Sequence, residues 1–119
     1  WTLGNDLTAN VPLTRMPPAY GRLGTRWSSQ SKLKPWAELE YQFATAQRRV
    51  SPSDVTDTRI GAKGTDGFSI INLRAGLSLL ERFRTTMALE NITDRAYKYH
   101  GSGVYRPGFQ VVLGAEVRF

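Results

Sequence analysis

Few residues of this chain could do chemistry, and the first candidates are two glutamates. Glu38 and Glu40 stand two apart in an alternating segment, so their carboxylates share one face of a strand. Such a pair can act as general acid and base. No third catalytic group accompanies the pair in the sequence. The favoured interpretation is therefore a solvated row of charged side chains, which lies beside Arg22, Arg26 and Arg74 of neighbouring strands.

The remaining candidates lie between the alternating segments. His100 is the only histidine, and one imidazole without partner ligands is a poor metal site. Asp54, Asp57 and Asp66 share one polar stretch, but their spacing does not match a calcium-binding loop. The chain has no cysteine, which removes thiolate chemistry and disulfides. We therefore predict no metal site and no cofactor, and the chain is predicted not to be an enzyme.

The formal charge of +6 and the isoelectric point of about 10.1 suggest nucleic-acid binding. A phosphate-binding surface needs a dense basic patch, however, and here the cations stand singly apart from the pair Arg48-Arg49. Scattered cations are equally typical of the polar lumen of a barrel. We therefore predict no nucleic-acid partner. Two alternatives stay open: a soluble five-stranded barrel that binds single-stranded nucleic acid, and a small barrel built from several copies of the chain.

Five segments of the chain alternate with a period of two, which is typical of strands. They cover residues 20–29, 36–47, 68–79, 83–91 and 109–119. Each approaches the roughly 9–11 residues that a tilted strand needs to cross a bilayer, whereas soluble strands average about 5–6. The connections are alternately long and short, as in outer-membrane barrels, with the shortest at residues 80–82. The sequence therefore predicts an all-β fold: an antiparallel up-and-down transmembrane β-barrel segment of about five strands, an incomplete barrel.

Three stretches, in this order, resemble TonB-dependent receptors of the bacterial outer membrane. Residues 15–24 are similar to the start of an earlier strand, with Arg15-Met16-Pro17-Pro18 before an alternating run. Residues 89–97 resemble the N-L-F-D element of the penultimate strand, although Thr93 stands where the family commonly has an aromatic residue. Residues 106–119 resemble the last strand, which ends on a phenylalanine. The resemblance covers nearly the whole chain.

The resemblance implies that residues 1–119 are the C-terminal part of a barrel of about twenty-two strands, without the plug domain or the TonB box. The complete receptor would take up a nutrient such as a siderophore or metal chelate, and the chain alone would be a structural fragment. The implied location is the outer membrane of the Gram-negative cell envelope. The implied partners are the upstream barrel and plug, lipid and lipopolysaccharide, the barrel insertion machinery, and TonB through the missing N-terminal part.

Two groups of residues follow as site predictions. The first group is an assembly signal for the insertion machinery, in which alternate side chains of the last strand face one way: Val111, Leu113, Ala115, Val117 and Phe119. The second group would contact ligand from extracellular loops, because loops on a rigid scaffold carry recognition. It contains Asp54, Asp57, Arg59, His100, Tyr105 and Arg106. The alternation also predicts that Glu38, Glu40, Arg74, Glu90 and Glu116 face the lumen.

Overall fold

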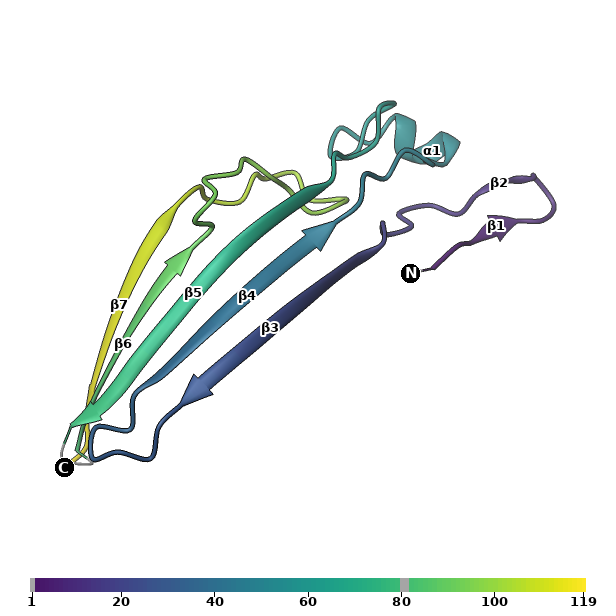
Figure 1. Cartoon of the computed structure of the whole chain (residues 1–119). Coiled ribbons are helices and arrows are strands. Elements are labelled where there is room, and N and C mark those ends of the chain that lie inside the picture. The colour runs from purple at the N-terminus through teal and green to yellow at the C-terminus, as the bar shows by residue number, and fades with distance from the viewer. Residues whose placement is uncertain (1, 80–81) are drawn as a thin grey trace. The chain divides into compact units, whose positions relative to one another are not determined.

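The computed structural model describes residues 2–79 and 82–119, and its regular structure is almost entirely β-strand. Near the N-terminus, β1 (Asn5–Asp6) and β2 (Val11–Pro12) form a short antiparallel ladder. One sheet contains β3 (Tyr20–Ser28), β4 (Trp36–Ala44), β5 (Phe68–Leu79), β6 (Phe83–Glu90) and β7 (Gln110–Val117) (Figure 1). A single helical turn, α1 (Pro52–Val55), lies between β4 and β5. No helix in the described residues is long and apolar enough to cross a membrane.

The five long strands pair in chain order, so the sheet is a meander. Strand β6 is antiparallel to both neighbours, and Phe83 stands opposite Leu79 of β5 and Val117 of β7. Figure 1 shows β3, β4 and β5 running in alternating directions. Within the described residues β3 and β7 are the two edges of the sheet and do not pair with each other. The predicted all-β antiparallel fold, an open barrel segment of five strands, is confirmed.

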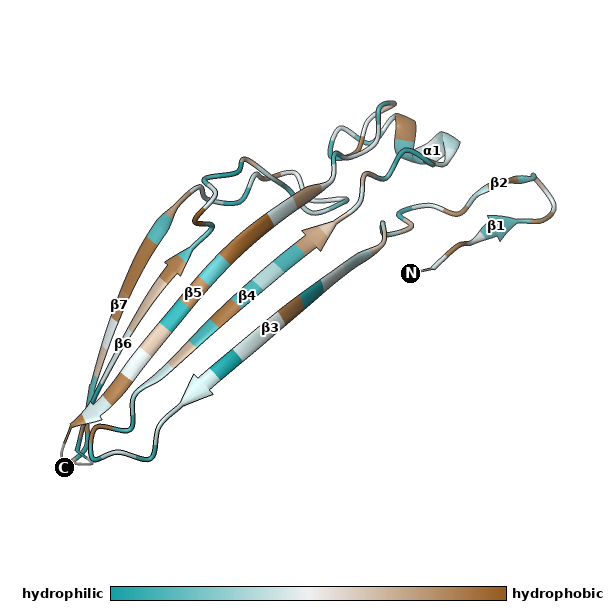
Figure 2. Cartoon of the chain, viewed as in Figure 1, coloured by the Kyte–Doolittle hydropathy of each residue, from teal (hydrophilic) through white to brown (hydrophobic). Residues whose placement is uncertain are grey.

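The register separates the sheet into an apolar and a charged face. One row across β5, β6 and β7 contains Leu73, Leu89 and Val111, and the next row on the same face is Ala75, Met87 and Leu113. Figure 2 shows the resulting alternation of hydrophobic and hydrophilic residues along the strands. We call the side of the sheet that carries these two rows the apolar face. The other side, the charged face, carries Asn72, Arg74, Ser78, Arg84, Thr86, Glu90, Gln110 and Glu116.

Four of the five strands are shorter than the sequence predicted. Strand β3 ends at 28 instead of 29, where the Ser29 N–H donates to the Pro35 carbonyl in the turn. Strand β4 ends at 44 instead of 47, and Gln47 forms an isolated bridge with Thr65. Strand β6 ends at 90 because Asn91 adopts a left-handed φ of 50°. Strand β7 spans 110–117 instead of 109–119. The predicted turn at 80–82 includes residues 80 and 81, which lie outside the described residues.

The chain divides into two compact units. The loop unit contains residues 1–21, 43–69 and 96–106, and the sheet unit contains residues 22–42, 70–95 and 107–119. The β1–β2 ladder lies in the loop unit, outside the five strands that the sequence predicted. The loop unit therefore has more regular structure than its Gly, Pro and Ser content indicates.

Neither unit has a large dry interior. The buried hydrophobic residues of the described chain are Ile60, Phe68, Ile70 and Tyr97. In the loop unit, the Phe68 and Tyr97 rings pack with centroids 4.3 Å apart. On the apolar face of the sheet, Leu113 is 75% exposed. A large exposed apolar face of this kind typically marks a surface that contacts another protein, a ligand or a membrane.

Candidate functional site

The charged face of the sheet unit carries a ladder of ion pairs centred on Arg74. Its guanidinium lies 3.6 Å from Glu38, 3.5 Å from Glu40 and 3.4 Å from Glu90. Glu40 also accepts a hydrogen bond of 2.9 Å from the Asn72 amide, and Arg22 lies 3.9 Å from its other oxygen. The ladder therefore joins side chains from four consecutive strands.

Glu38 is held by two arginines and is not poised for proton transfer. Arg26 lies 3.2 Å from it, and the same guanidinium lies over the Trp36 ring at 4.2 Å. With Arg74 on its other side, Glu38 has a cationic partner for each oxygen. Both carboxylate oxygens are therefore engaged in ion pairs, and these are the atoms through which a general acid or base would exchange a proton. The ladder thus has the character of a solvated, charge-balanced wall.

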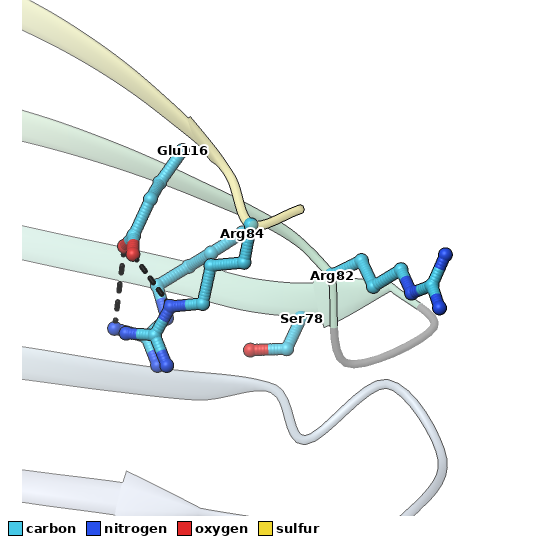
Figure 3. A pocket seen from close by; sticks show the side chains of 5 residues that line it. Ser78, Arg82, Arg84 and Glu116 are labelled. Carbon is cyan, nitrogen blue, oxygen red and sulfur yellow. Dashed lines mark hydrogen bonds and ion pairs between the residues drawn. The ribbon is translucent and has the colours of Figure 1, made fainter.

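A second polar cluster lies on the charged face near the end of β5 and the start of β6 (Figure 3). Glu116 pairs with Arg118 at 2.7 Å and with Arg84 at 3.6 Å. These groups line a cavity of about 10 Å³ together with Ser78 and Arg82. A cavity of this volume has room for about one water molecule. It is too small for an organic substrate.

The stretch that follows β6 is organised by one buried asparagine. The Asn91 side-chain amide donates to the carbonyls of Arg95 and Pro107, and its oxygen accepts from the Arg95 N–H. Its own N–H donates to the Asn72 side chain at 2.8 Å. Asp94 then accepts a 2.8 Å hydrogen bond from the Phe109 N–H just before β7. Two side chains of the motif at residues 89–97 therefore fix the turn after β6 and the start of β7.

In the loop unit, Asp54 performs a structural role. It is 3% exposed, and it forms a capping box with Ser51 at the start of α1. The same carboxylate accepts a hydrogen bond of 2.9 Å from the Arg15 N–H, which lies 39 residues earlier. Asp54 thus fastens the N-terminal segment to the β4–β5 connection, and little of it is accessible to a ligand.

Asp57 and Arg59 form a forked ion pair nearby. The Arg59 guanidinium donates to both Asp57 oxygens, at 2.9 and 2.7 Å. These bonds, together with the Arg59 N–H, lower the pKa of Asp57 well below its usual range. Arg15 adds a third cationic contact at 3.3 Å. Arg59 itself is partly exposed, so its outer edge can meet a ligand.

The β6–β7 connection brings His100, Tyr105 and Arg106 into the loop unit. The His100 Nδ1 atom lies 3.0 Å from the Thr65 hydroxyl. Tyr105 is 64% exposed, with the Lys98 ammonium 5.8 Å from its ring centroid. Arg106 lies at the same distance from the Tyr99 ring. The predicted ligand-binding residues therefore fall in one unit, in which Asp54 is buried and Tyr105 is exposed.

Several residues that organise the loop unit carried no sequence signal. Lys98 donates from Nζ to the Arg59 carbonyl at 3.0 Å, and Arg15 and Thr65 make the long-range contacts described above. The capping box could have been read from Ser51-Pro52-Ser53-Asp54, because serine followed three residues later by an acidic residue typically starts a helix. The described residues contain no group of three or more His, Asp or Glu that could hold a metal ion.

Comparison with known proteins gives one structural match. No protein-family model and no curated protein matches the sequence. Among solved structures, the chain is similar to copper transporter OprC, with a TM-score of 0.76 over 98% of this chain and 18% sequence identity. The chain spans 19% of the length of that transporter. At this identity the likeness shows the fold: an antiparallel β-meander that also occurs within a much longer transporter chain.

Proposed function

We propose that this chain is the C-terminal part of the β-barrel wall of a TonB-dependent receptor in the bacterial outer membrane. The complete receptor would import a nutrient such as a siderophore or another metal chelate. The observation that carries the proposal is the two-faced meander: one face is apolar and uncovered, while the other bears paired charges. Lipid suits the first face and a hydrated lumen suits the second.

The transporter likeness supports this proposal through the fold. A segment of copper transporter OprC has the same arrangement over nearly the whole length of this chain. In the proposed receptor the chain has a structural role, and the loop unit contributes ligand contacts from Asp57, Arg59, His100, Tyr105 and Arg106. Residues Val111 to Phe119 would be recognised by the insertion machinery, since β7 is an edge strand of the sheet and their alternate side chains are exposed.

A soluble nucleic-acid-binding barrel fits the structure less well. Such a barrel closes around its apolar side chains and presents aromatic and basic residues outward. Here Leu23 is 69% exposed, and the arginines Arg22, Arg26 and Arg74 are paired with glutamates. No specific feature of the described residues favours nucleic-acid binding over a membrane wall.

Single-cysteine labelling tests the orientation of the faces, because the chain has no cysteine of its own. Thr86 and Met87 are matched positions: they are adjacent in β6, both are exposed, and they lie on opposite faces. With the protein in bilayers, a water-soluble maleimide is expected to label Thr86→Cys rapidly and Met87→Cys slowly, since lipid excludes the reagent. Detergent solubilisation should make Met87→Cys reactive as well. Rapid labelling of Met87→Cys together with protection of Thr86→Cys in bilayers would reverse the faces and defeat the proposal.

A further inference from the structure

The single histidine of the chain lies in an unusual place for an ionisable loop residue. His100 is half-buried, and its Nδ1 atom lies 3.0 Å from the Thr65 hydroxyl. Its Nε2 atom is buried and has no hydrogen-bond partner among the described residues. Buried side-chain polar atoms are paired in the large majority of cases, so an unpaired one points to a functional or conformational role.

The unpaired nitrogen restricts the protonation state of the imidazole. A neutral imidazole has one N–H and one bare nitrogen, and the Thr65 hydroxyl can serve either form at Nδ1. A protonated imidazole has an N–H on both nitrogens, which places a charged donor at Nε2 with no acceptor to receive it. Burying an unpaired charged donor is costly. The observed arrangement therefore favours the neutral form of the imidazole.

The charges around His100 do not remove this penalty. Asp54, from the α1 segment, favours the cation, whereas Lys98, two residues away, disfavours it. Burial outweighs both and lowers the pKa of His100. The Asp54 Oδ2 atom already accepts hydrogen bonds from the Arg15 and Ser51 N–H groups.

His100 stands at the junction of two connections of the loop unit. Thr65 belongs to the β4–β5 connection and is tied there to Gln47 by two backbone hydrogen bonds. His100 belongs to the β6–β7 connection, which is also linked to the β4–β5 connection by the Lys98 bond to the Arg59 carbonyl. We propose that His100 is a proton-operated latch between these two connections: the neutral imidazole holds them together, and protonation releases them.

The sign of the pH dependence follows from linkage. The open form binds a proton more readily than the closed form, because its imidazole is in water. The closed form is therefore favoured fully above about pH 6.5, the ordinary pKa of histidine, and loses stability as the pH falls below it. The closed-to-open ratio falls by at most tenfold for each unit by which the two pKa values differ. The latch does not depend on the transport proposal, since it needs only the contacts within the loop unit.

The test combines two readouts on the full chain in detergent micelles. Because His100 is the only histidine, carbon-13 histidine labelling gives its protonation curve by NMR without assignment. Spin labels at Thr58→Cys and Val104→Cys report the distance between the two connections, and both positions are exposed. The expected result is one short distance at pH 7.5 and a growing longer component toward pH 5, with the NMR midpoint below 6.5. The variant His100→Gln cannot protonate and should keep the short distance throughout.

Three outcomes would overturn the latch. The first is an NMR midpoint at or above 6.5, which would show that burial does not oppose protonation. The second is a distance between the spin labels that does not change from pH 7.5 to pH 5 in the protein that keeps His100. The third is opening of His100→Gln over the same pH range, which would assign the pH dependence to another group. The variant Thr65→Val separates the hydrogen bond from the proton, and it should open the loops at every pH.

Discussion

Replacing Gly76 by alanine tests whether the charged face is packed as closely as the structure shows. A Cβ at this position would lie 2.7 Å from Trp36 Nε1 and 2.8 Å from the Thr85 carbonyl oxygen. Contacts this short force a neighbour to move. The carbonyl is part of the paired β6 backbone, and the indole is held on its ring face by Arg26 at 4.2 Å. Neither neighbour can yield without losing an interaction.

The magnitude follows from two opposing effects. Overpacking costs roughly 1–3 kcal/mol, and moving the indole away from Arg26 would lose a cation–π contact of about 0.5–1 kcal/mol. Alanine is preferred to glycine in a strand by roughly 0.5–1 kcal/mol, which offsets part of the loss. The loss of the cation–π contact and the gain from alanine nearly cancel, so we expect Gly76→Ala to lower the free energy of unfolding by about 1–3 kcal/mol.

Two other glycines of the sheet unit provide matched controls. At Gly24 the nearest atom to a new Cβ is the Leu39 carbonyl oxygen at 3.5 Å, an ordinary contact, so Gly24→Ala should be neutral or slightly stabilising. At Gly114 the Cβ would lie 2.6 Å from the Thr86 hydroxyl, which can rotate away. Gly114→Ala should therefore fall between the other two variants.

The assay is equilibrium unfolding in urea from phospholipid vesicles, followed by far-ultraviolet circular dichroism. This signal is chosen because tryptophan fluorescence would respond to Trp36 itself. A double-mutant cycle with Trp36→Leu should recover part of the loss at Gly76, and the part due to the Thr85 carbonyl should remain. Equal stability of Gly76→Ala and Gly24→Ala would refute the packing on which this reasoning rests.

Two further substitutions test the ladder and the loop unit. Arg74→Met removes three ion pairs and should cost about 1–2 kcal/mol of unfolding free energy, because each partly exposed pair contributes roughly 0.2–1 kcal/mol. Arg22→Met, which removes one 3.9 Å pair from an exposed side chain, should change the same quantity very little. Asp54→Asn turns one buried acceptor into a donor, and it should cost the loop unit about 1 kcal/mol, measured by hydrogen exchange of the Arg15 amide. Asp66→Asn is the exposed control, and an equal loss there would contradict the assigned role of Asp54.

The sheet could be predicted from the sequence because its information is local. A strand places successive side chains on opposite faces, so the alternation of Leu73 with Arg74, or of Leu113 with Gly114, already defines both faces. The strand ends could not be predicted in this way. They depend on contacts between distant residues, such as the Gln47–Thr65 bridge and the Phe109 bond to Asp94.

The loop unit was harder to predict for the same reason. Asp54, Asp57 and Arg59 were grouped as ligand contacts because they are polar residues of one loop. The structure uses Asp54 for a helix cap and for the Arg15 backbone, a partner that no local pattern reveals. Asp57 and Arg59 are two residues apart in the sequence. Their forked ion pair depends on side-chain conformation, which this spacing alone does not specify. Whether these loops bind ligand stays a prediction.

The turn at Asn91 shows how the course of the backbone can be held without fixing the residues around it. The bonds of its side-chain amide go to main-chain carbonyls, and Asp94 likewise receives a main-chain N–H. Main-chain groups are present whatever the residue, so neighbouring positions can vary freely while the turn survives. A strand connection held in this way tolerates substitutions around it, which is consistent with a shared fold at 18% sequence identity.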